Sequence, residues 1–204
     1  MDPRRSEMFP LRRRDVAKAL LADREDLLVV AGLGSTAWDA TAAGDHPLTF
    51  PLWGAMGGAA LIGLGLALAQ PQRRVLVITG DGELLMGLGG LATIGAQRPL
   101  NLAVVVFDNE RYGETGMQTT HTAHDVDLAG VARACGFPVT GTVRDLSELE
   151  AALPAIRAAD GPVFHAIKVR AESLPLVMPP KDGAHLKDRF RLALLGPAAV
   201  AATV

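Results

Sequence analysis

"LVITGDGELLMGLGGLATIGAQRPLNLAVVVFDNERYG", residues 76–113, contains two apolar runs with a helical stretch between them. Residues 75–79 and 102–108 are apolar enough to be strands covered on both faces of a parallel sheet. The residues between them predict a helix, so the stretch forms a strand–helix–strand unit. Asp81 follows the first run and Asn109 the second. Because such strands can lie side by side, we expect both side chains to project into one space at the carboxyl edge of the sheet.

Further strands and helices alternate along the rest of the chain. Strands are predicted over residues 26–32, 139–143 and 162–169, and helices over residues 11–22, 53–70, 82–97, 127–137 and 145–159. Turns and loops are predicted over residues 32–39, 41–51 and 109–124. This alternation predicts an α/β fold, a doubly wound, mostly parallel sheet with helices on both faces. The expected domain covers residues 1–170, and residues 171–204 form a tail, with a short helix over 187–195, that packs on the domain or on a partner.

The composition limits the classes of function. The chain has 204 residues, 49% of them hydrophobic, which predicts one domain with a substantial core. Its net charge of −2 argues against a nucleic-acid or anionic-membrane partner. Residues 56–69, the most apolar stretch, are too few to span a bilayer, and no secretory signal is recognised, which predicts a cytoplasmic protein. Cys135 is the single cysteine and is interpreted as a small buried residue; Arg12, Arg13 and Arg14 are interpreted as a solvated helix start.

Asp81 and Asn109 together favour a metal site. Mg²⁺ prefers six oxygen ligands, commonly one or two protein side chains with substrate phosphates, and a backbone carbonyl after Asn109 would add another. Gly80 and Gly82 would let the backbone approach a phosphate, and the helix that begins near Glu83 would direct its amides toward it. Alternatively, Asp81 caps a helix and Asn109 shapes a turn. The pairing within one strand–helix–strand unit, with a glycine on each side of the acid, favours the metal–diphosphate site.

These residues carry a family resemblance. "GDG" at 80–82 and "DN" at 108–109 resemble the fingerprint of the thiamine diphosphate-dependent enzymes, in which Gly-Asp-Gly precedes a pair of asparagines. Asp108 stands where the family often has the first asparagine, whereas Asn109 is retained. The resemblance implies that Asp81, Asn109 and the carbonyl of Arg111 bind Mg²⁺, which anchors the diphosphate.

Two further segments resemble the same family, and the likeness extends over residues 28–170. "LWGAMGGA" at 52–59 resembles the segment that holds the aminopyrimidine, which implies that the Gly54 carbonyl accepts from its amino group and that Met56 enforces the bent shape of the cofactor. In "GLGST" at 32–36, Ser35 or Thr36 would bond the diphosphate. The implied cofactor-binding residues are Gly34, Ser35, Thr36, Gly54, Met56, Gly80, Asp81, Gly82, Glu83, Asn109, Arg111, Tyr112 and Gly113.

The resemblance covers only half of such an active site. In this family the glutamate that activates the cofactor lies on a separate pyrimidine-binding domain of similar size, for which 204 residues leave no room. The chain is therefore expected to join a separate pyrimidine-binding subunit, in an α₂β₂ or larger assembly. The small-residue helix over 54–69 is the candidate interface.

The reaction implied is decarboxylation of a 2-oxo acid. Residues 111–137 and 174–190 resemble the sulfopyruvate and phosphonopyruvate decarboxylases, which implies release of CO₂ and an aldehyde. The expected substrate contacts are Glu114, Thr115 and Gln118, and Glu114, Thr115 and His121 are the catalytic candidates. For His121 and His124, loop polarity is favoured over a proton-transfer role, and His46 has no assigned role. Lys187 and Arg189 are interpreted as a solvated helix face rather than as contacts to an anionic substrate group.

Other functions stay open on the sequence. A carboligase of the acetolactate-synthase or acyloin type shares every motif, and a non-catalytic subunit that only holds the cofactor would keep them too. A ferredoxin-linked 2-oxo acid oxidoreductase is disfavoured because it typically brings cluster-binding cysteines. A nicotinamide-binding Rossmann protein is a weaker reading, since "GLGSTA" at 32–37 lacks the third glycine of the dinucleotide motif.

Overall fold

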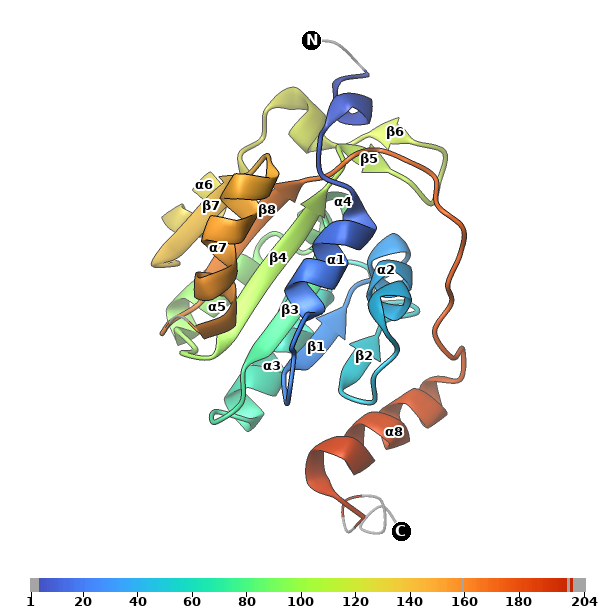
Figure 1. The fold of residues 1–204 in the computed structure, drawn as a ribbon. Coiled ribbons are helices and arrows are strands. Elements are labelled where there is room, and N and C mark those ends of the chain that lie inside the picture. Colours follow the sequence, from blue (N-terminus) through green and yellow to red (C-terminus); the bar gives the residue numbers. More distant parts are fainter. Residues whose placement is uncertain (1–3, 159, 198, 200–204) are drawn as a thin grey trace.

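The computed structural model describes residues 4–158, 160–197 and 199, and its middle layer is a six-stranded parallel sheet. The strand order is β2-β1-β3-β4-β8-β7 (Figure 1). The strands are β1 (Leu28–Ala31), β2 (Thr49–Pro51), β3 (Val75–Gly80), β4 (Leu102–Asp108), β7 (Val139–Val143) and β8 (Val163–Lys168). All neighbouring pairs run parallel, and β1, β3 and β4 are buried almost throughout. The predicted doubly wound sheet is confirmed.

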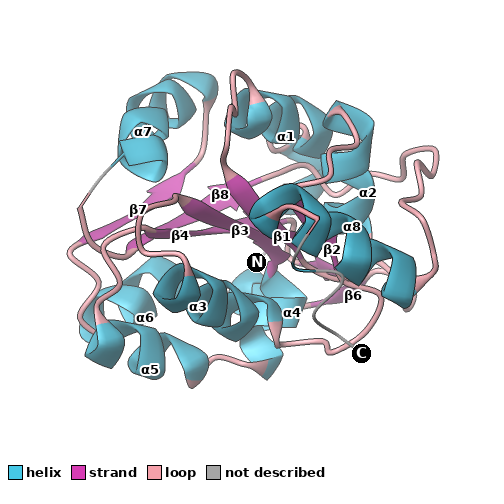
Figure 2. Ribbon diagram, turned by 90° about the horizontal axis from the view of Figure 1, so that it is seen from below, coloured by secondary structure: helices cyan, strands magenta, loops and turns pink. Residues whose placement is uncertain are grey.

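Helices cover both faces of the sheet (Figure 2). One face carries α1 (Arg13–Leu21), α2 (Ser35–Ala43) and α7 (Leu146–Ala158), and the other carries α3 (Ala59–Ala69), α4 (Asp81–Met86), α5 (Gly90–Gln97) and α6 (Leu128–Ala134). Two hydrophobic clusters, one on each side of the sheet, form the core because alternate side chains of each strand point to opposite faces. This arrangement leaves the carboxyl edge of the strands for the loops that carry the polar residues.

Several predicted boundaries were wrong. Residues 53–58 are irregular, so the helix predicted from residue 53 begins at Ala59. The helix predicted over 82–97 is broken between α4 and α5 by a stretch with two glycines, which have low helix propensity. Helix α2 replaces much of the predicted turn at 32–39, and its weak apolar periodicity explains why the pattern missed it.

Short elements also lie within the two predicted loops. Strand β2 was missed because it has three residues, ends in a proline and lies at the sheet edge. The loop predicted over 109–124 contains an antiparallel hairpin of β5 (Arg111–Tyr112) and β6 (Gln118–Thr119), followed by the 3₁₀ helix η2 (His121–His124). This hairpin connects the end of β4 to the residues that surround Asp81.

Helix α3 packs closely on the sheet through its small residues. A Cβ built on Gly63 would lie 2.1 Å from Cγ2 of Val77 on β3, so only glycine allows this approach. Leu61 and Leu68 lie on the outer face and are exposed. The small residues of α3 and Leu64 therefore serve the core, while Leu61 and Leu68 face outward.

The C-terminal segment packs back on the domain. After β8 the chain runs extended past α2 to α8 (Gly183–Leu195), which lies against β2 (Figure 1). Phe190 of α8 meets Phe50 edge to face at 5.7 Å, and Arg189 pairs with Asp45 at 2.7 Å. Arg189 is thus held in an ion pair on the surface. In the described part of the chain, no helix combines the length and hydrophobicity needed to cross a membrane.

Candidate cofactor and metal site

Asp81 and Asn109 meet at the carboxyl edge of two neighbouring strands. Strands β3 and β4 pair in parallel with Gly80 opposite Phe107, so the residues that follow them emerge together. Asp81 is the first residue of α4, and Asn109 follows β4 directly. Both line a cavity of about 190 Å³, here called the cofactor cavity. Its lining is Arg13, Leu33, Ser35, Met56, Gly80, Asp81, Gly82, Glu83, Phe107, Asn109, Arg111, Tyr112, Gly113, Glu114 and Thr115.

Asp81 is a buried carboxylic acid whose ionised form is energetically unfavourable in this environment. It is 2% exposed, and its Oδ2 accepts hydrogen bonds from the hydroxyls of Thr120 at 2.5 Å and Thr122 at 3.1 Å. Burial, with the nearby negative charge of Asp108, raises the pKa of Asp81 to about 7, although both hydroxyls act in the opposite direction. A cation beside this carboxylate would relieve the unfavourable charge.

Asp108, at the position where an asparagine is common in the family, is compensated by a lysine. Lys168 at the end of β8 lies 2.7 Å from Oδ2 of Asp108. The Thr122 hydroxyl lies 2.7 Å from Oδ1 and so joins Asp108 to Asp81. The additional negative charge is thereby balanced on the side away from Asn109.

The chain turns sharply between Asn109 and Arg111. Oδ1 of Asn109 accepts from the backbone N–H of Arg111 at 3.0 Å, and Glu110 between them has a left-handed φ of 60°. Tyr112 then packs over the Gly-Asp-Gly turn, where a Cβ on Gly82 would lie 2.5 Å from its ring. Gly82 is therefore required by this contact, whatever the ligand.

The donor set fits a magnesium–diphosphate group. A carboxylate, an amide oxygen and a backbone carbonyl provide hard oxygen ligands, and Mg²⁺ usually leaves its other positions to phosphates and water. A Cβ on Gly80, which lines the cofactor cavity, would meet no atom within 4 Å, so this wall has room for a ligand. Among the described residues no group of three or more His, Cys, Asp or Glu side chains offers an alternative closed metal centre.

Several other predicted residues reach the cofactor cavity. Met56 lines it and is 42% exposed, so it is not a core methionine. Ser35 also lines it, at the start of α2. Glu114 packs against Gly34, and burial raises its pKa despite the positive charge of Arg13. Glu83 is buried, its Oε2 accepts from Thr79 at 2.7 Å, and burial raises its pKa.

Other predicted residues lie outside this lining, and their roles stay predictions. The Thr36 hydroxyl is buried and donates to the Gly32 carbonyl at 2.8 Å. Gly34 borders a separate cavity of about 220 Å³. The remaining two, Gly54 and His121, are exposed and do not line the cofactor cavity. Of the two, Gly54 lies two residues before Met56 in the loop that leads to α3.

Among the residues predicted to contact the substrate or to have catalytic roles, some line the cofactor cavity and others do not. Thr115 lines the cofactor cavity, and its hydroxyl donates to Gln118 at 2.9 Å. His124, like His121, is exposed on η2. His46 is half-buried and accepts from the Leu48 N–H at 3.1 Å, which gives it a structural role in a turn.

The interpretation of the arginine cluster as a solvated helix start was wrong for Arg13. Its side chain is buried, reaches the cofactor cavity and pairs with the buried Asp39 at 2.8 Å. Arg14 pairs with the same carboxylate at 3.2 Å, and only Arg12 is exposed. Asp39 lies on α2, the helix that the sequence pattern missed, so no local signal pointed to this pairing. The prediction of a small buried residue holds only in part for Cys135, which is half-buried.

The fold and this site define a class of protein. The chain belongs to the thiamine pyrophosphate enzymes, since residues 33–167 match the model of the family's C-terminal TPP binding domain. Benzoylformate decarboxylase from Polynucleobacter necessarius has a similar fold, with a TM-score of 0.68 at 22% identity over 82% of this chain and 34% of that one.

Two curated relatives are much more similar in sequence. The chain is 41% identical to sulfopyruvate decarboxylase subunit beta of Methanothermobacter thermautotrophicus over 180 residues, which are 88% of this chain and 94% of the relative. It is 39% identical to phosphonopyruvate decarboxylase of Streptomyces viridochromogenes over 202 residues, which are 98% of this chain and 50% of the relative. The chain therefore matches nearly all of the separate subunit but half of the second enzyme.

Proposed function

We propose that this chain is the cofactor-binding subunit of a thiamine diphosphate-dependent 2-oxo acid decarboxylase, which releases CO₂ and an aldehyde. The observation that carries the proposal is the cofactor cavity, where Asp81, Asn109 and Arg111 meet at the carboxyl edge of the sheet. The two relatives named as sulfopyruvate and phosphonopyruvate decarboxylases support the reaction class. They also support a short 2-oxo acid with a second anionic group as substrate.

Different residues of the chain would hold different parts of the cofactor and its metal ion. The Asp81 carboxylate, the Asn109 amide oxygen and the Arg111 carbonyl would hold Mg²⁺, and Ser35 would bond the diphosphate. Bound thiamine diphosphate supplies the electron sink that decarboxylation of a 2-oxo acid requires. Met56 would pack against the apolar body of the cofactor, since it combines cavity lining with an exposed side chain.

Glu114 is the carboxyl group of this cavity best suited to hold a proton near the substrate. Its pKa is raised by burial, and it lies in the turn of the β5–β6 hairpin, after the proposed metal ligands. Arg13, across from it in the cavity lining, retains net positive charge together with Arg14, because one Asp39 carboxylate pairs with both guanidinium groups. This charge would favour an anionic substrate.

A partner subunit would complete the site with the activating glutamate, in an α₂β₂ or larger assembly. Relatives named as subunit beta support this division of the enzyme. The exposed side chains of Leu61, Leu68 and Met86 support an apolar partner surface on α3 and at the end of α4. The small-residue face of α3 is packed on the sheet, so the outer face is the part available to a partner.

The test is CO₂ release from a panel of 2-oxo acids by the chain purified with its partner from the native host. Sulfopyruvate, phosphonopyruvate, pyruvate and a bulky aryl 2-oxo acid are compared with thiamine diphosphate and Mg²⁺ present, and with EDTA as control. Metal-dependent release that requires the partner would support the proposal, whereas ligated products without net aldehyde would replace it with carboligation. Asp81→Ala is expected to abolish Mg²⁺-dependent cofactor binding, and unchanged affinity would refute the metal assignment.

A further inference from the structure

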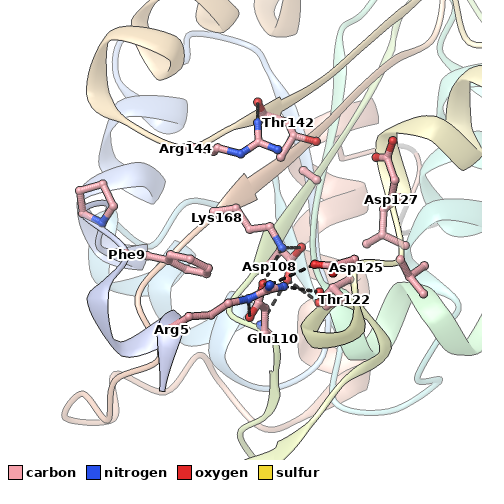
Figure 3. A pocket seen from close by; sticks show the side chains of 14 residues that line it. Arg5, Phe9, Asp108, Glu110, Thr122, Asp125, Asp127, Thr142, Arg144 and Lys168 are labelled. Carbon is pink, nitrogen blue, oxygen red and sulfur yellow. Dashed lines mark hydrogen bonds and ion pairs between the residues drawn. The ribbon is translucent and has the colours of Figure 1, made fainter. Parts of the chain in front are cut away.

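Two buried carboxylates flank the proposed metal ligand Asn109. Asp108 and Glu110 are each 2% exposed, and neither lines the cofactor cavity. Both instead face a second cavity of about 540 Å³, together with Arg5 and Lys168 (Figure 3). The side chains on either side of Asn109 therefore lie outside the cofactor cavity and in a cluster of charges.

Lys168 links the two flanking carboxylates. Its Nζ lies 2.7 Å from Oδ2 of Asp108 and 2.9 Å from Oε1 of Glu110. Because one ammonium group contacts the residue before Asn109 and the residue after it, the distance between those two side chains is set by Lys168. The lysine lies on β8, which pairs with β4 with Asp108 opposite Lys168.

Arg5 closes the cluster from the N-terminal 3₁₀ helix η1 (Arg5–Met8). Its Nε and Nη2 donate to the two oxygens of Glu110, both at 2.8 Å. The same guanidinium donates to the Thr122 carbonyl at 3.0 Å and to Asp125 at 3.0 Å. This bidentate pair orients the Glu110 side chain, as planar guanidinium–carboxylate geometry does in general.

Glu110 has a backbone conformation that needs such support. Its φ of 60° lies in the left-handed region, which costs a residue with a Cβ roughly 1 kcal/mol or more. The turn at Glu110 directs the chain from Asn109 to Arg111. The Glu110 carbonyl also accepts from the Thr120 N–H at 3.0 Å, and Thr120 in turn donates its hydroxyl to Asp81. The geometry of all three proposed metal ligands thus depends on Glu110.

We propose that Lys168 and Arg5 are positioning residues for the metal site. They hold Asp108 and Glu110 in place and so fix the Asn109 oxygen and the Arg111 carbonyl for Mg²⁺. Thr122 extends the effect to Asp81, since its hydroxyl lies between the carboxylates of Asp108 and Asp81. The inference rests on the proposed function and adds to it two residues that do not contact the cofactor cavity.

The experiment measures Mn²⁺ binding to the full chain by electron paramagnetic resonance in excess thiamine diphosphate. Lys168→Met and Arg5→Met are each expected to weaken Mn²⁺ binding by about 10-fold or more, as loss of groups that orient metal ligands does. Lys168→Arg is expected to restore binding to within roughly 3-fold of wild type, because it keeps a cation at both carboxylates. Arg189→Met removes an ion pair far from the site and is the matched control.

The outcomes separate this inference from the proposed function. Thermal unfolding is followed in parallel, so that Mn²⁺ affinity is expressed per folded molecule. If this affinity is unchanged in both Lys168→Met and Arg5→Met, the positioning role is overturned. Arg5 is the second variant because its side chain is 30% exposed and its loss threatens folding less. If instead wild type binds Mn²⁺ no more tightly than Asp81→Asn does, the metal site itself is refuted, and with it the proposed function.

Discussion

Replacing Asp81 by asparagine should stabilise the metal-free protein while it abolishes metal binding. The carboxylate is buried beside Asp108, and its pKa stands at about 7 instead of 3.8. At about 1.36 kcal/mol for each tenfold change in an equilibrium constant, the ionised carboxylate costs the fold up to about 4 kcal/mol. Because Asp108 shares in the repulsion, we expect a gain of about 2–4 kcal/mol in Asp81→Asn above pH 7.

The pH dependence gives the sign of the effect. The folded protein keeps the Asp81 proton up to about pH 7, whereas the unfolded chain releases it near pH 4, so wild-type stability falls as the pH rises between these values. Asparagine carries no such proton. The variant and wild type should therefore be similar near pH 4 and differ most above pH 7.

The assay is thermal unfolding in EDTA at pH 5 and pH 8, followed by titration with Mg²⁺ and thiamine diphosphate. For a chain of this size the expected gain corresponds to roughly 4–15 °C at pH 8. Asp39→Asn is the matched control: burial raises the pKa of Asp39 as well, but this equally buried carboxylate pairs with Arg13 and Arg14. Its loss removes the ion pair of the buried Arg13 guanidinium and should therefore destabilise the fold by about 3–5 kcal/mol. A lower melting temperature for Asp81→Asn at pH 8 would refute the reasoning.

Three further experiments test other features of the fold and the proposed partner surface. His165 is buried with both ring nitrogens unpartnered among the described residues, and burial lowers its pKa. Protonation of His165 should thus destabilise wild type by about 1–2 kcal/mol relative to His165→Leu as the pH falls from 6.5 to 5, against the opposite effect of Asp81 that both proteins share, as urea unfolding would show; an identical pH dependence of the two proteins would contradict this. Gly63→Ala should cost about 1–3 kcal/mol through overpacking against Val77, whereas Gly65→Ala, on the open face of the same helix, should gain about 0.5–1 kcal/mol in the same measurement; equal effects would contradict the close packing of α3. Leu68→Glu on the exposed face should weaken co-purification with the partner and leave the melting temperature unchanged, and undiminished recovery of the partner would exclude this surface.

The charge at position 108 shows how a site adapts to a change in its motif. An aspartate in place of an asparagine brings a second buried carboxylate close to Asp81. Lys168 lies opposite it on the neighbouring strand and neutralises it at 2.7 Å. The pairing of these two residues explains how a second buried carboxylate near Asp81 is tolerated.

The local sequence pattern was enough to predict the strongly apolar elements and the placement of Asp81 and Asn109. Strands β3, β4 and β8 match the predicted runs closely, because buried parallel strands are apolar over their whole length, and β7 also matches although it is a half-buried edge strand. Helix α7 begins at Leu146, one residue after the predicted start, and Asp145 caps it by accepting from the Glu148 N–H at 2.9 Å. The failures were short or weakly amphipathic elements such as β2 and α2, whose existence depends on the sheet and helix they pack against.

By itself, the sequence determined the order of the elements, the class of sheet and the meeting of Asp81 and Asn109, because these depend on period, composition and the common direction of adjacent strands. Only the tertiary structure decided which distant charges support that meeting. Arg5 and Glu110 are 105 residues apart, and Lys168 and Glu110 are 58 apart, yet all three join in one ion-pair cluster. No local pattern encodes such a contact, since it arises when the N-terminal helix and β8 pack at the same edge of the sheet. The proposed binding residues could thus be predicted from the motif, while the charged residues that contact their neighbours were set by the fold.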